Sequence, residues 1–159
     1  MEKIQDNFLN TKEFKSIADV VLGGNFPWYY NDSVVKGEKI KNNFLWTHTF
    51  YLDNVISSSF FKHLEPLLEK IYIKSLIRIK ANAYINHGSE IEHLSHADYP
   101  WSHKVALYSL NTTNGYTLVE GKKIQGIANR LLQYDGSIPH ASATCTDQNI
   151  RVNIVINYF

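Results

Sequence analysis

The chain has 159 residues, of which 44% are hydrophobic, 13% aromatic and 19% charged. This length and apolar content predict one compact domain with a sizeable core, and they argue against disorder. The net charge of +1 creates no field that would attract nucleic acid, and the single cysteine excludes an internal disulfide.

The start of the chain does not resemble a signal peptide, because Met1 is followed by the charged Glu2 and Lys3. Apolar stretches stay well below the roughly 20 residues that a membrane span needs. We therefore expect a cytoplasmic protein without membrane contact. Cys145 is expected to be a small buried or loop residue.

Helical patterns are expected in the N-terminal part, about residues 1–72. Asn10 and Glu13 are typical of a capping box, and apolar residues at helical spacing follow until Gly23-Gly24. A second helical pattern covers residues 58–71 and contains Pro66, which predicts a kink or two short helices. Residues 26–30 are expected to form a short aromatic strand.

The period changes to two from about residue 74 onward. In residues 77–85 the apolar positions alternate with Arg78, Lys80, Asn82 and Tyr84. Further strands are expected at residues 105–110 and 130–134. A hairpin is expected around Glu120-Gly121-Lys122, and a turn at Asp135-Gly136.

The last nine residues alternate in the same way. Their two faces are Val152, Ile154, Ile156 and Tyr158 on one side, and Arg151, Asn153 and Asn157 on the other. Helices followed by many short strands predict an α+β, mainly β fold. We expect a double-stranded β-helix, or cupin-like jelly roll, over about residues 74–159, with the N-terminal helices packed on one sheet.

One constellation of polar residues carries chemical information. His96 and Asp98 are two positions apart, so on an extended segment both side chains project to the same side. With His140 from a distant strand they can hold a metal on one face of its octahedron, the ligand set of mononuclear non-haem iron(II) oxygenases. His93 is a local competitor of His96, since a spacing of three would suit a helix. Arg151 follows and can hold an acidic co-substrate through its planar guanidinium.

The chain resembles the iron(II)- and 2-oxoglutarate-dependent dioxygenases, most closely their prolyl-hydroxylase-like branch. The residues that carry the resemblance are His96-Ala97-Asp98, Tyr108-Ser109-Leu110-Asn111, Asn114-Gly115-Tyr116-Thr117, Pro139-His140 and Arg151. The resemblance covers nearly the whole chain, best from His96 to the end. The chain has Asn114-Gly115 where that branch often has Gly-Gly, which blurs the subfamily.

The resemblance implies that His96, Asp98 and His140 bind Fe(II) and that Arg151 pairs with the distal carboxylate of 2-oxoglutarate. It also implies O2 as second co-substrate, release of succinate and CO2, and hydroxylation of an unactivated C–H bond. Asn82 and Tyr84 resemble the Asn-x-Tyr pair with which nucleic-acid demethylases among the relatives hold the co-substrate. Asn153, on the face of Arg151, is a further candidate.

The substrate is expected to be peptidyl, including prolyl, or a small molecule; nucleic acid fits the charge poorly. Trp28, Tyr30, Trp101 and His103 are candidates for lining its pocket, although such aromatic residues usually belong to a core. The oligomeric state is left open by the sequence.

Two other functions fit the same pattern. One is a cupin-like metalloprotein that does not use 2-oxoglutarate, and the other is a non-enzymatic binding jelly roll in which the motif is coincidental. Arg151 separates the first from the oxygenase, because only 2-oxoglutarate use requires a cation across from the metal. An ion pair with Asp147 would be the ordinary structural explanation of Arg151.

Overall fold

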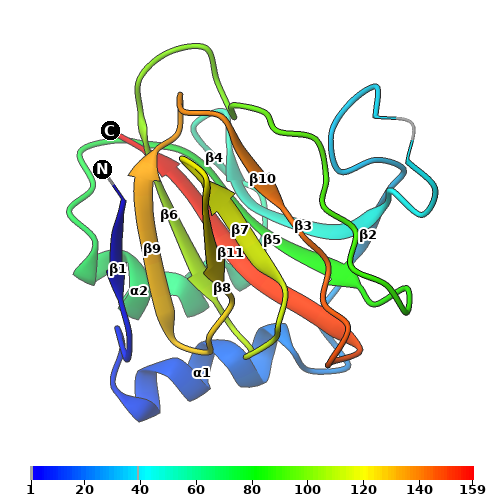
Figure 1. Cartoon of the computed structure of the whole chain (residues 1–159). Helices are drawn as coiled ribbons and strands as arrows, with labels where there is room; N and C mark the ends of the chain where they lie inside the picture. Colours follow the sequence, from blue (N-terminus) through cyan, green and yellow to red (C-terminus); the bar gives the residue numbers. More distant parts are fainter. Residues whose placement is uncertain (1, 39) are drawn as a thin grey trace.

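Two sheets face each other in the computed structural model, which describes residues 2–38 and 40–159 (Figure 1). Among these residues, eight strands form a large sheet in the order β1-β9-β6-β11-β5-β3-β2, with β4 beside β3. A small sheet in the order β10-β7-β8 lies in front of it. The large-sheet strands are β1 Lys3–Gln5, β2 Tyr29–Asn31, β3 Leu45–Leu52, β4 Val55–Ile56, β5 Leu76–Ile85, β6 Lys104–Ser109, β9 Arg130–Asp135 and β11 Ile150–Tyr158. The small sheet contains β7 Tyr116–Val119, β8 Lys122–Gln125 and β10 His140–Ser142.

Helices cover the outer face of the large sheet. They are α1 Thr11–Val21, the 3₁₀-helix η1 Ser59–Leu64 and α2 Glu65–Lys70. Asn10 caps α1 through the reciprocal capping box with Glu13, and Pro66 lies in the first turn of α2. The expected packing of N-terminal helices on one sheet is therefore confirmed, as are two short helices around Pro66.

The main core lies between these helices and the large sheet. Its helical contributions include Ile17, Val21, Leu64 and Leu67, and its sheet contributions include Ile79, Ala81, Val152, Ile154 and Ile156. A smaller apolar cluster fills part of the space between the two sheets; it comprises Val105, Leu107, Val119, Ile124, Leu132, Tyr134 and Val155. The jelly-roll expectation is confirmed by these two facing sheets.

Strand β11 determines which side chains face the small sheet. It pairs with β5 and β6 in antiparallel register, so that Arg151 lies opposite Tyr84, Asn153 opposite Asn82 and Val155 opposite Lys80. Residues directly opposite each other share a face, and alternate residues share it along a strand. The polar positions of β5 and β11 therefore form one inward-facing surface.

The first half of the chain contains more strand than expected. Strand β3 lies in the part expected to be helical, and its pairing with β5 shifts register between Thr49 and Tyr51. Such an irregularity interrupts the two-residue period, which explains why the pattern gave no strand signal. The strand expected at residues 26–30 is β2 at Tyr29–Asn31, because Phe26 is buried in the helix-side core. None of the described helices combines the length and apolar character needed to cross a bilayer.

Candidate metal centre

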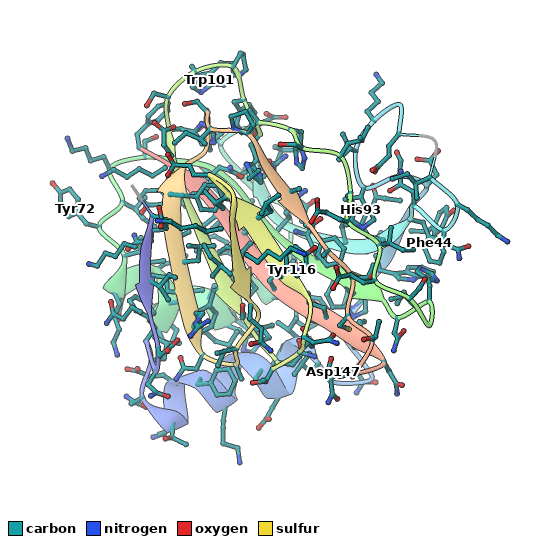
Figure 2. All side chains as sticks on the ribbon, in the orientation of Figure 1. Phe44, Tyr72, His93, Trp101, Tyr116 and Asp147 are labelled. Carbon is teal, nitrogen blue, oxygen red and sulfur yellow. The ribbon has the colours of Figure 1, made fainter. Side chains whose placement is uncertain are left out.

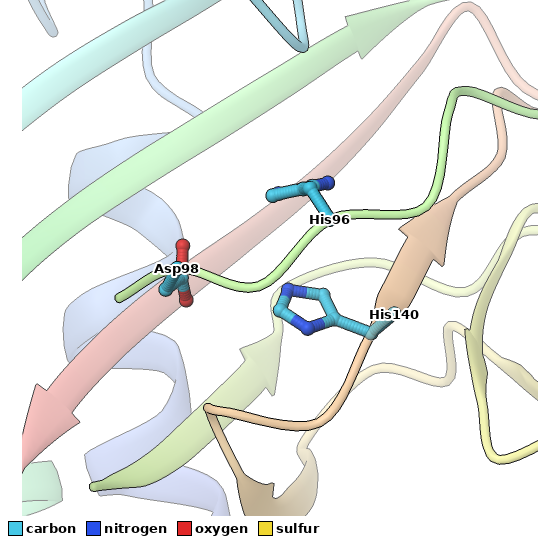
Figure 3. Close-up of side chains that lie close together, drawn as sticks. All are labelled: His96, Asp98 and His140. Atoms are coloured by element: carbon cyan, nitrogen blue, oxygen red, sulfur yellow. The ribbon is translucent and has the colours of Figure 1, made fainter. Parts of the chain in front are cut away.

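Three side chains from two segments of the chain converge between the sheets (Figure 3). His96 and Asp98 lie on the segment that connects β5 to β6, and His140 is the first residue of β10. The backbones of His96 and His140 exchange two hydrogen bonds of 2.9 Å, which fixes the two imidazoles beside each other. One ligand atom from each of the three residues lies within 4.8 Å of the others. The structure thus brings together the triad that the spacing predicted.

Both histidines present the same ring nitrogen for binding. The Nδ1 of His140 lies 3.0 Å from the carbonyl of Ile138, and the Nδ1 of His96 lies 3.2 Å from the carbonyl of Leu94. A carbonyl only accepts, so each Nδ1 carries the hydrogen and each Nε2 keeps its lone pair. Burial lowers the pKa of His140, which favours the neutral imidazole that a metal requires.

The Asp98 carboxylate is held from two sides. Arg78 donates from Nη2 to its Oδ1 at 2.8 Å, and Asn157 donates from Nδ2 to its Oδ2 at 2.8 Å. Arg78 also donates from Nε to the Asn157 side chain at 3.2 Å. Burial raises the pKa of Asp98, but the charge of Arg78 and the hydrogen bond from Asn157 outweigh it and lower the pKa to about 2. Asp98 is therefore ionised, and its orientation is fixed.

A small cavity adjoins the triad and encloses about 50 Å³. It reaches from His96, Asp98 and His140 along the inward face of β5, past Lys80 and Asn82 to Tyr84, and the other residues lining it include Thr117 and Ser142 from the small sheet. Several buried polar atoms around this space have no hydrogen-bond partner among the described residues. They are Asn82 Oδ1, Asn153 Nδ2, Ser142 Oγ and Arg151 Nε.

Unpaired buried polar atoms cost about 1–3 kcal/mol each, so a cluster of them indicates a place that a polar ligand completes. Carboxylate oxygens would accept from Asn153 Nδ2 and Arg151 Nε. The donor set of the triad and these orphaned atoms therefore fit a divalent metal and a small polar acid side by side.

Arg151 lies behind this cavity and is 2% exposed. Its guanidinium donates to the carbonyl of Ala143 at 3.0 Å and to the hydroxyl of Thr117 at 2.7 Å, and it lies 5.3 Å from the centre of the Tyr84 ring. Among the ion pairs of the described residues none joins Arg151 to Asp147, which instead accepts from the backbone of Asn114. Arg151 is thus a buried cation with neutral partners only.

Gly115 makes room for this arginine. A Cβ at this position would lie 2.8 Å from Arg151 Cδ and 3.0 Å from the carbonyl of Thr144. The first distance is shorter than real Cβ contacts and the second is tight, so a side chain at residue 115 would force Arg151 to move.

The four candidates for lining a substrate pocket lie in different places. Trp28 packs against Phe26 on the helix side, and Tyr30 is exposed on the edge strand β2. Trp101 is 49% exposed at the tip of the loop before β6 and stacks on Tyr99 (Figure 2). His103 is buried, and its Nε2 lies 3.2 Å from the Asn157 amide. His103 therefore contacts a partner of Asp98.

His93 is separate from the triad. Its side chain is buried beside Glu38, with 3.6 Å between His93 Nδ1 and Glu38 Oε2. Glu38 also accepts a hydrogen bond from the backbone of Leu94 at 2.5 Å. His93 thus attaches the loop before β3 to the segment that carries His96.

Sequence reasoning assigned no role to Arg78, Lys80 or Asn157. The two-residue period had placed Arg78 and Lys80 on the face of Asn82, and Asn157 on the face of Arg151, so the signal was present. The pattern does not reveal that the loop with Asp98 folds over these residues.

Three solved structures match nearly the whole chain. A prolyl hydroxylase from Trichoplax adhaerens, in complex with a hypoxia inducible factor oxygen degradation domain peptide fragment, matches with a TM-score of 0.70 and 18% identity, covering 99% of this chain and 83% of that one. A 2OG-Fe(II) oxygenase family oxidoreductase from Burkholderia pseudomallei matches with a TM-score of 0.68 and 14% identity, covering 99% of this chain and 84% of that one. The non-heme alpha ketoglutarate dependent epimerase SnoN from nogalamycin biosynthesis matches with a TM-score of 0.69 and 13% identity, covering 99% of this chain and 77% of that one.

The chain has the fold that these three proteins share. Comparison of the sequence with protein-family models and with curated proteins gave no match. The likeness therefore rests on three-dimensional structure at low identity, together with the His-Asp-His group.

Proposed function

We propose that the chain is an Fe(II)- and 2-oxoglutarate-dependent dioxygenase that hydroxylates an unactivated C–H bond of a peptidyl, including prolyl, or small-molecule substrate. The observation that carries the proposal is the convergence of ligand atoms of His96, Asp98 and His140 within 4.8 Å beside a small cavity. The lining of this cavity includes two buried polar atoms without a partner among the described residues, Asn82 Oδ1 and Ser142 Oγ. When bound, Fe(II) with 2-oxoglutarate and O2 supplies oxidative decarboxylation to succinate and CO2 coupled to C–H oxidation.

The protein's own residues have distinct tasks in this proposal. His96 and His140 offer Nε2, and Asp98 offers a carboxylate oriented by Arg78 and Asn157. Two imidazoles and one carboxylate leave the remaining positions of the metal open for co-substrate and O2.

The far end of the cavity suits the distal carboxylate of the co-substrate. Asn82, Tyr84 and Thr117 line this part of the cavity, and the Arg151 guanidinium lies next to Tyr84 and Thr117, with its Nε unpaired among the described residues. A guanidinium buried among neutral partners is stabilised by a carboxylate. A cavity of about 50 Å³ is smaller than a five-carbon diacid, so binding of the co-substrate requires this space to widen.

Turnover tests the proposal. Purified protein with Fe(II), O2 and 2-oxoglutarate is expected to release succinate slowly without substrate and faster with a true substrate. His140→Ala is expected to abolish this release, whereas Lys15→Met on the exposed face of α1 is expected to leave it unchanged. Succinate release that is the same in wild type and His140→Ala would contradict the proposal.

The product decides between reaction outcomes on this fold. One structure with a similar fold is an epimerase, so the fold does not by itself specify hydroxylation. A hydroxylase adds one oxygen atom to its substrate, whereas an epimerase leaves the mass unchanged. Mass spectrometry of substrate and product is expected to show the gain of one oxygen, and an unchanged mass after full conversion would contradict hydroxylation.

A further inference from the structure

Lys80 is a cation inside the candidate site to which no role has yet been given. It lies on the inward face of β5 between Arg78 and Asn82, and it lines the same cavity as the three metal-binding candidates. Its register partners are Val155 on β11 and Thr49 on β3. The ammonium group therefore belongs to the space between the sheets.

Lys80 has no anion in direct contact among the described residues, because the nearby Asp98 carboxylate is hydrogen-bonded to other side chains. Asp98 is engaged by Arg78 and Asn157, and among the described residues Lys80 forms no hydrogen bond or ion pair. Burial, and then the charge of Arg78, lower the pKa of Lys80 to about 8, although the Asp98 carboxylate acts in the opposite direction. A partly buried ammonium beside another cation is stabilised when an anion binds next to it.

Lys80 is also placed apart from the residues that suit the co-substrate's distal carboxylate. Arg151 pairs in register with Tyr84, which is four residues further along β5 than Lys80, or roughly 13 Å at the usual rise of a strand. Lys80 instead lies near the end of β5 that holds Asp98. Three cations thus lie along this face: Arg78, which pairs with Asp98, then Lys80, and Arg151 at the other end.

The surface around Lys80 continues toward the edge of the sheet. Thr49 shares its face and also lines a groove of about 550 Å³ at this edge. The groove is polar and partly aromatic; its residues include Tyr29, Tyr30, Asn31, Thr47, Ser57 and Ser59. Lys80 itself does not line the groove, but Thr49, its neighbour across the strands, does, so the groove adjoins the lysine.

We propose that Lys80 binds an acidic group, a carboxylate or phosphate, of the primary substrate, which approaches over the groove beside β2 and β3. The assignment of the anion to the substrate rests on the proposed function. Anion binding at Lys80 itself can be measured without metal or turnover. The proposal narrows the substrates to molecules with an anionic group close to the oxidised carbon.

Inorganic sulfate is the probe for this site. Its affinity is measured from the shift in thermal unfolding of metal-free protein, with chloride at matched ionic strength as the reference. Lys80→Met keeps an unbranched side chain of nearly the same length and removes the charge, and we expect it to weaken sulfate binding at least about tenfold. Lys80→Arg is expected to retain binding, and Lys15→Met, an exposed lysine on α1, is expected to match wild type.

A second arm identifies the source of the anion. The same titration is repeated on protein saturated with Mn(II) and 2-oxoglutarate. Retention of the Lys80-dependent sulfate site, with unchanged 2-oxoglutarate affinity in Lys80→Met, is expected. Competition between sulfate and 2-oxoglutarate, together with loss of 2-oxoglutarate affinity in Lys80→Met, would assign the lysine to the co-substrate and overturn the proposal. Equal sulfate affinity in wild type and folded Lys80→Met would remove the anion site altogether, without bearing on metal binding.

Discussion

The two faces of strand β11 differ in how well their side chains are satisfied. The outward face carries Val152, Ile154 and Ile156, all buried against the helices in an apolar core. The inward face carries Arg151 and Asn153, each with a buried polar atom that lacks a partner among the described residues. The first face stabilises the fold, whereas the second is left incomplete in a way that a metal and a small acid would complete. Because side chains alternate along β11, one face of this strand packs in the core and the other face lines the candidate site.

Removal of a metal ligand should produce the largest effect. Asp98→Ala takes away one of three ligands, and we expect the affinity for Mn(II) to fall by more than the 10–100-fold that is typical of residues behind the ligands. Calorimetric titration measures this, with the exposed Asp19→Ala on α1 as control. Unchanged affinity in Asp98→Ala would contradict the assignment of this carboxylate.

The outward face is tested by Ile154→Ala. Ile154 is fully buried, so its truncation should lower the free energy of unfolding by about 2–5 kcal/mol. Denaturant titration gives the value. Metal affinity of the folded fraction should stay as in wild type, and a selective loss of metal binding without a loss of stability would break the distinction between the two faces.

Arg151→Met tests the far end of the inward face. We expect 2-oxoglutarate to bind roughly 10–100-fold more weakly, because one charge-assisted interaction is lost, while Mn(II) affinity changes little. Arg130→Met is the matched control, since Arg130 pairs with Asp6 at the surface of the same sheet. Equal 2-oxoglutarate affinity in wild type and Arg151→Met would show that another residue anchors the co-substrate.

The metal-free protein should lose stability as the pH falls, and this effect of Asp98 is smaller than the effects of the substitutions above. The pKa of Asp98 is about 2 in the folded chain and 3.8 ordinarily, so its contribution is present above pH 4 and is lost as the pH falls toward 2. The difference corresponds to about 2 kcal/mol. Between pH 5 and 2, the free energy of unfolding should fall less steeply with decreasing pH in Asp98→Asn than in wild type. Identical pH dependence of this free energy in the two proteins would contradict the lowered pKa.

Asn153→Ala should give the smallest change. Its amide nitrogen is unpaired in the buried site, so the lost hydrogen bond with Asn82 is offset by removal of an unsatisfied donor. We expect the free energy of unfolding to change by less than about 1 kcal/mol, as measured by denaturant titration. A loss as large as that of Ile154→Ala would mean that the inward face is a structural core as well.

The sequence predicted the second half of the fold well because its strands alternate regularly. Residues 77–85 follow the two-residue period throughout and residues 151–158 follow it except at Val155, and both segments form long central strands. Strand β3 was missed because its irregularity at Thr49 interrupts the period, and the three-residue strand β1 is too short to produce a pattern.

The spacing of residues along the sequence predicted the side chains of the candidate site but not the contacts that hold them. The pattern indicated His96, Asp98, His140 and the inward position of Arg151. The contact of Arg78 and Asn157 with Asp98 depends on how the connecting loop folds back over the sheet, which no local spacing encodes. The same loop determines that Trp101 is exposed and His103 is buried.

Calorimetric titration of 2-oxoglutarate into protein with and without bound Mn(II) tests the central claim most directly, since the claim is that metal and acid complete one site. We expect one 2-oxoglutarate per chain in the presence of the metal and much weaker binding in its absence. Equal affinity with and without metal, or no binding in either case, would contradict the account.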